Sequence, residues 1–129
     1  MNLKKQSKNF IAIATFSMAL AIALGAFGAH GLKSILTQEM LTVYHTGIQY
    51  QFYNTLGLLC LGFLINFKEE IKKLVIASWL VVIGTFIFSF SLYLLVILDM
   101  PILGAITPIG GTMLIIGWLI TTYSILKDE

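Results

Sequence analysis

The sequence predicts an all-α protein, a four-helix transmembrane bundle with both ends of the chain in the cytoplasm. The first observation is that four runs contain no Asp, Glu, Lys or Arg, and their lengths are 24, 28, 25 and 27 residues. An α-helix rises about 1.5 Å per residue, so about 20 apolar residues cross the roughly 30 Å hydrocarbon core of a bilayer. The second observation is that the lysines between these runs are concentrated on alternate sides. The runs cover residues 9–32, 40–67, 74–98 and 100–126.

The composition excludes a water-soluble domain of this size. Charged residues make up 11% of the 129 residues, whereas soluble domains average about 25%. Four spans use most of the chain, so we expect one integral membrane domain over residues 1–129, surrounded by the lipid bilayer. The net charge of +2 is too small for a nucleic-acid partner. Cys60 is the only cysteine, which excludes an internal disulfide and a cysteine-based zinc site.

The first helix is predicted over about residues 10–29. Its apolar stretch is longer than the roughly 7–15 residues of a signal-peptide core, so we expect it to remain uncleaved. Small residues recur at every fourth position and form a stripe along one face. In a bilayer such a stripe allows close helix packing, which is a main source of helix association. The stripe consists of Ser17, Ala21, Gly25 and Ala29.

The second helix is predicted to begin after Thr37, a residue that can cap a helix N-terminus, and to continue to about residue 67. Glu39 lies in its first turn, where a negative charge suits the helix dipole. This segment is longer than the hydrocarbon core requires, so the predicted span is about 45–66. We expect the first two turns to lie among lipid headgroups, with Tyr44 and His45 in the interfacial belt.

The start of the fourth helix has the clearest local signal. Thr107 is predicted as its N-cap, and Pro108 suits the first helical position because its missing N–H is not needed there. Gly110 and Gly111 follow, and we interpret them as a site of close contact between helix backbones. The alternative is that their unobstructed N–H groups attract an anion. The third and fourth spans are predicted over residues 74–98 and 108–126.

The lysines predict the orientation. Seven of the eight lie in the two terminal segments and in the loop between the second and third helices. Lys33 alone lies on the other side. Cytoplasmic loops are enriched in Lys and Arg, so both termini should face the cytoplasm. The seven are Lys4, Lys5, Lys8, Lys68, Lys72, Lys73 and Lys127.

A few polar residues lie at membrane depth. An amide in hydrocarbon must find a partner or cost about 1–2 kcal/mol or more. We interpret Gln51 and Asn54 as hydrogen-bonding between helices, and the alternative is that they line a pocket or a path. His30 either caps the carbonyls that end the first helix or acts as a ligand or proton carrier. The predicted orientation places five polar residues in the outer half of the bilayer as one connected cluster: His30, Gln51, Asn54, Ser89 and Thr107.

Four segments in order resemble one known family. They read GAFGAHGL at 25–32, YQFYN at 50–54, FSFSLYL at 88–94 and LGAITPIGG at 103–111. Together they are similar to the bacterial "domain of unknown function 423" family, whose eukaryotic relatives are called transmembrane protein 256. The resemblance covers nearly the whole chain and implies a small inner-membrane protein. Many family members carry His at the position of Asn54 and Gly at that of Phe90, so the departure at Asn54 favours a structural role there.

These features predict a structural or interaction component of the membrane, associated with a second copy or with another membrane protein. The alternative is an oligomeric transporter or channel component for a small solute or ion, although coupled transporters commonly use ionised groups within their spans. We expect no enzyme activity and no cofactor, because the sequence contains no Ser/His/Asp set, no paired carboxylates and no metal-ligand spacing.

Overall fold

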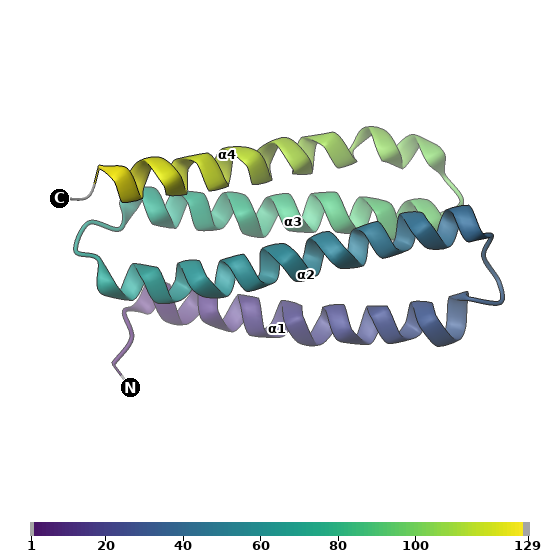
Figure 1. Ribbon diagram of the computed structural model, residues 1–129, viewed down its shortest axis with the longest axis horizontal. Helices are drawn as coiled ribbons and strands as arrows, with labels where there is room; N and C mark the ends of the chain where they lie inside the picture. Colours follow the sequence, from purple (N-terminus) through teal and green to yellow (C-terminus); the bar gives the residue numbers. More distant parts are fainter. Residues whose placement is uncertain (1, 128–129) are drawn as a thin grey trace.

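A computed structural model describes residues 2–127 and shows an all-α chain with four long helices, α1 to α4 (Figure 1). A π-helical turn, η1, follows α1, and a short 3-10 helix, η2, precedes α4. The predicted all-α class with four helices is confirmed. The elements are α1 Lys5–Phe27, η1 Gly28–Leu32, α2 Gln38–Phe67, α3 Lys72–Leu98, η2 Pro101–Ala105 and α4 Thr107–Leu126.

The helices lie side by side in chain order, and each runs antiparallel to the one before it (Figure 1). Each packs mainly against its neighbour in the sequence, as short connections favour. The N-terminus, the C-terminus and the α2–α3 connection share one end of the molecule, and η1 and η2 lie at the other. We call these the terminal end and the loop end.

Two apolar cores fill the two ends of this array. The core at the terminal end is built around Phe10, Ile65 and Leu74. The core at the loop end is built around Tyr44, and its ring packs against that of Tyr93 with centroids 5.2 Å apart. The buried positions between these cores carry polar side chains, so a polar layer divides the interior.

The helix boundaries agree with the sequence except at the start of α1. That helix begins at Lys5, about five residues before the predicted span, because a helix can continue past its apolar run into the headgroup zone. Thr37 caps α2 as predicted, since its hydroxyl accepts from the Met40 N–H at 3.2 Å. Thr107 is not a cap. It is the first residue of α4, Ile106 takes the N-cap position, and the Thr107 hydroxyl bonds to a side chain of α3.

The buried face of α1 departs from the predicted small-residue stripe. Ala21 is buried, Ser17 bonds to α2, and Gly25 lies within van der Waals reach of α2, but Ala29 is exposed. A strict four-residue repeat drifts around a helix of 3.6 residues per turn, so the inner face passes to Gly28. A Cβ at Gly28 would lie 2.4 Å from the ring of Tyr44, so only glycine fits there.

Tyr44 is fully buried between helices, whereas the sequence predicted that it faces the lipid headgroups. Its hydroxyl donates to the Leu24 carbonyl at 2.5 Å, which joins α2 to α1. The ring of Tyr44 packs into the space that the absence of a side chain at Gly28 leaves, whereas His45 beside it is exposed.

Three segments are long and apolar enough to cross a membrane: Lys5–Leu32, Lys72–Leu98 and Pro101–Leu126. α2 is not among them, because Gln49, Gln51 and Asn54 interrupt its apolar sequence. The outer surface of the helices carries many exposed large apolar side chains, which suits contact with lipid tails.

Candidate functional site

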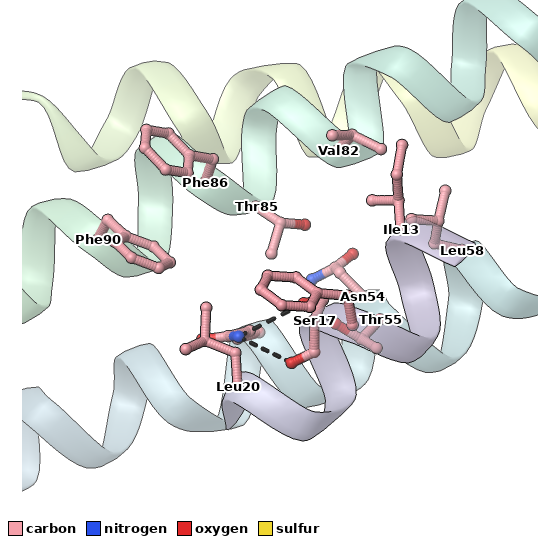
Figure 2. A pocket seen from close by; sticks show the side chains of 12 residues that line it. Ile13, Ser17, Leu20, Asn54, Thr55, Leu58, Val82, Thr85, Phe86 and Phe90 are labelled. Carbon is pink, nitrogen blue, oxygen red and sulfur yellow. Dashed lines mark hydrogen bonds between the residues drawn. The ribbon is translucent and has the colours of Figure 1, made fainter. Parts of the chain in front are cut away.

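A cavity of about 290 Å³ lies at the polar layer, between α1, α2 and α3 (Figure 2). Aliphatic and aromatic side chains form most of its lining, and polar side chains of α1, α2 and α3 form the rest. No Asp, Glu, Lys or Arg lines it. The lining residues are Ile13, Phe16, Ser17, Leu20, Gln51, Asn54, Thr55, Leu58, Val82, Thr85, Phe86 and Phe90.

Gln51 is the centre of the largest hydrogen-bond network in this layer. Its Nε2 donates to the Ser17 carbonyl at 3.0 Å, and its Oε1 accepts from the Tyr93 hydroxyl at 2.7 Å. The Ser17 hydroxyl in turn lies 2.7 Å from the hydroxyl of Thr55. One buried amide, 1% exposed, therefore joins α1, α2 and α3.

Asn54 joins α2 to α4. Its Oδ1 accepts from the indole Nε1 of Trp118 at 2.9 Å, and its Nδ2 donates to the Tyr50 carbonyl of its own helix at 2.9 Å. A carboxamide has two N–H donors, so one hydrogen of Nδ2 is left after these bonds.

Two further pairs hold α3 at the loop end. Ser89 donates to the Gly47 carbonyl of α2 at 2.7 Å, and Ser91 pairs with the Thr107 hydroxyl of α4 at 2.5 Å. Gly110, one turn into α4, meets α3 so closely that a Cβ there would lie 2.5 Å from the Phe88 nitrogen. Gly111 is looser, because its Cβ would lie 3.6 Å from the Phe88 ring.

The structure does not join the five residues of the predicted polar cluster into one network. Gln51 and Asn54 line the same cavity, but Ser89 and Thr107 bond separately to other helices. His30 is exposed on η1, and its side chain makes no hydrogen bond among the described residues.

The cavity lies beside the middle of α2 and the middle of α3. Gln51 and Asn54 flank the middle of α2, which has 30 residues, and Thr85 is the central residue of α3, which has 27.

Sequence reasoning missed several members of this layer. Tyr93 and Trp118 carry polar tips on apolar bodies, which is the pattern expected of interfacial residues as well as of buried ones. The sequence analysis gave Ser17 a role in helix packing alone. However, its position in α1 fits a series with alternating steps of three and four residues, which marks the inner face of the helix. The series is Ser7, Phe10, Ala14, Ser17 and Ala21.

The sequence analysis did not predict Thr85 as a member of the polar layer, because no feature of the neighbouring sequence indicates such a role. Its hydroxyl oxygen is buried and has no hydrogen-bond partner, a property shared among the described residues only with Ser7. Figure 2 shows the Thr85 hydroxyl and the Asn54 carboxamide directed into the cavity from α3 and from α2. Within residues 2–127, no three His, Cys, Asp or Glu side chains are grouped to hold a metal ion.

The long apolar helices, their lipid-compatible surface and the neutral polar layer between them define a multi-pass helical membrane protein. The chain belongs to the DUF423 family ("Protein of unknown function"), which it matches over residues 24–111. The resemblance drawn from its four motifs is thereby confirmed.

Its relatives are bacterial membrane proteins of similar length. It is 42% identical over 120 residues to UPF0382 membrane protein YwdK of Bacillus subtilis, covering 93% of this chain and 98% of the relative. UPF0382 membrane protein SERP0230 of Staphylococcus epidermidis is also 42% identical, over 93% of this chain and 97% of its own length. A UPF0382 membrane protein of Haemophilus influenzae is 36% identical, over 93% and 95% of the two chains. No solved structure gives a significant match.

Proposed function

We propose that this protein is a structural and interaction component of the bacterial cytoplasmic membrane, without enzyme activity, which associates with a second copy or with another membrane protein. The observation that supports it most is that polar side chains in the interior form hydrogen bonds between helices. Gln51, Asn54 and Ser89 all bond to neighbouring helices. Polar side chains that are hydrogen-bonded between helices hold the bundle rigid, so that it can act as a platform.

The proposed topology has four spans, with both termini in the cytoplasm. The terminal end carries seven of the eight lysines, as the positive-inside rule expects of a cytoplasmic end. α2 can cross the bilayer despite its lower hydropathy, because the side chains of Gln51 and Asn54 are buried against other helices.

Gln49 supports the association with a partner. It is exposed on the outer surface of α2, between Thr46 and the exposed rings of Tyr50 and Tyr53. An amide that faces hydrocarbon without a partner costs about 1–2 kcal/mol, and a partner helix that offered it a hydrogen bond would recover this.

The oligomeric state and the partners test the proposal. We expect the protein, extracted from native membranes in a mild detergent, to be recovered as a complex larger than the monomer. Gln49→Leu should weaken this complex, whereas Thr122→Val, a matched polar-to-apolar change of an exposed residue on α4 whose hydroxyl bonds only to its own backbone, should leave it intact. A solitary monomer after crosslinking in intact membranes would contradict the proposal.

The cavity favours a second candidate, an oligomeric transporter or channel component for a small solute or ion. One cavity of about 290 Å³ does not extend through the bundle, so a path would need several copies. Flux in liposomes distinguishes the two proposals. Movement of a small neutral solute or an ion above that of empty vesicles would favour the transporter, and its absence would favour the structural component.

A further inference from the structure

The hydroxyl of Thr85 is the one threonine hydroxyl in the described chain that lacks a hydrogen bond. Six other helical threonines donate to a carbonyl of their own helix, and Thr37, Thr55 and Thr107 bond to other groups. The usual partner of the Thr85 hydroxyl would be the carbonyl of Val81, four residues earlier. The Thr121 hydroxyl donates in this way to the carbonyl of Gly117. Instead the Thr85 oxygen is buried, unpartnered, at the wall of the cavity.

We propose that this cavity binds one neutral, lipid-soluble molecule through a carbonyl oxygen, and that the ligand is of the isoprenoid quinone class. Thr85 supplies one donor. Asn54 supplies the second, since its Nδ2 has one hydrogen left after its bond to the Tyr50 carbonyl. Figure 2 shows these two groups facing the same space, where an acceptor oxygen would satisfy both.

The rest of the lining selects a neutral and flat molecule. No ionised side chain lines the cavity, so a charged ligand would lie there without a counter-charge. Phe86 and Phe90 stack at 4.8 Å with an angle of 19° between their planes, and both belong to the wall. A conjugated ring packs well against such an aromatic surface.

The cavity is reached from the bilayer. Phe16 of α1 and Phe86 of α3 both line it and are 71% and 61% exposed, so it opens on the lipid-facing surface between these helices. A volume of about 290 Å³ accommodates one substituted ring. An isoprenoid tail would then leave between α1 and α3 into the lipid.

The depth of the donors distinguishes a quinone from a phospholipid. Thr85 is the central residue of α3, so its hydroxyl lies near the middle of the hydrocarbon core. The ester carbonyls of phospholipids lie at the border of that core, about 15 Å from its middle. A carbonyl at the depth of Thr85 therefore belongs to a molecule that dissolves wholly in the hydrocarbon.

The test uses duroquinone, a fully substituted benzoquinone that cannot add to the Cys60 thiol, and durene, the same tetramethylated ring without carbonyls. Binding to the purified full chain in maltoside micelles is followed by quenching of Trp118, which bonds to Asn54, in a Trp79→Phe background. We expect saturable quenching by duroquinone and little competition from durene.

Thr85→Val removes the hydroxyl at nearly constant shape, and we expect it to weaken duroquinone binding about three- to tenfold, the effect of one neutral hydrogen bond. Thr15→Val is the matched control, because that hydroxyl bonds only to its own helix and lies outside the cavity. Its affinity should equal that of the parent. Thr85→Ser keeps the hydroxyl and should bind within about twofold of the parent.

Three results would each overturn the proposal: quenching that rises linearly without saturation, equal competition by durene, or an unchanged affinity in Thr85→Val. Should Thr85→Val fail to fold, Thr85→Ala takes its place with the same expected loss, measured against Thr15→Ala.

Discussion

The indole N–H of Trp118 donates to the Asn54 carboxamide oxygen at 2.9 Å, across 64 residues of sequence. The bond joins α4 to α2, two helices that are not neighbours in the chain. Gly57, one turn from Asn54, makes room for it, because a Cβ there would lie 2.4 Å from the Trp118 ring. The bond thus links two helices that are separated in the chain by α3.

Asn54→Leu should destabilise the protein. The change removes the acceptor of Trp118 and leaves a part-buried indole N–H unpaired, at a cost of about 1–3 kcal/mol. Unfolding in mixed micelles with increasing SDS measures the difference. Gln49→Leu, a similar change at an exposed position of the same helix, serves as the control and should alter the stability of the monomer little. Equal effects of the two changes would show that the bond to Trp118 contributes nothing.

The two adjacent glycines of α4 should respond differently to alanine. Gly110→Ala places a Cβ 2.5 Å from the Phe88 nitrogen, a backbone atom that cannot move without shifting α3. We expect a loss of about 1–3 kcal/mol. Gly111→Ala meets the Phe88 ring at an ordinary 3.6 Å and should be neutral or slightly stabilising, since alanine favours the helix. A thermal melt of both variants decides the matter, and a reversed order would refute the close α3–α4 contact.

Gln51 and Tyr93 should be energetically coupled. Their side chains bond at 2.7 Å in the buried polar layer, so the effects of Gln51→Leu and Tyr93→Phe should not add. Double-mutant cycles in membrane proteins give about 0.6 kcal/mol on average and at most about 1.7, and we expect a coupling in this range. Tyr93→Phe paired with Thr15→Val, at a site with no shared partner, should give additive effects. A coupling near zero would mean that the hydrogen bond is not formed in the membrane.

The proposed orientation predicts which cysteines react from outside the cell. In a Cys60→Ala background, Ser34→Cys near η1 should be labelled in intact cells by a thiol reagent that does not cross the cytoplasmic membrane. Glu69→Cys, between α2 and α3, should be labelled only after the membrane is opened. Both positions are exposed, so a lack of labelling reports sidedness and not burial. The opposite pattern would place the termini outside.

The sequence predicted the helices better than their contacts. The limits of α2, α3 and α4 follow from charge-free runs and from local signals such as Thr37, which depend only on residues close in the chain. The polar layer was predicted from Gln51 and Asn54, because their cost in hydrocarbon is evident from residue type alone. Their partners were not predicted, and His30 and Thr107 were grouped with them although the structure keeps them apart.

By itself, then, the sequence determined the membrane class, the four helices and the inward-facing amides, because length, hydropathy and helical period are local properties. The tertiary structure alone decided that Trp118 meets Asn54, that Gly28 receives the ring of Tyr44, and that Thr85 faces a cavity without a partner. Each of these depends on the rotation of one helix against another. That rotation results from the packing of all the side chains at an interface together, which no single segment encodes.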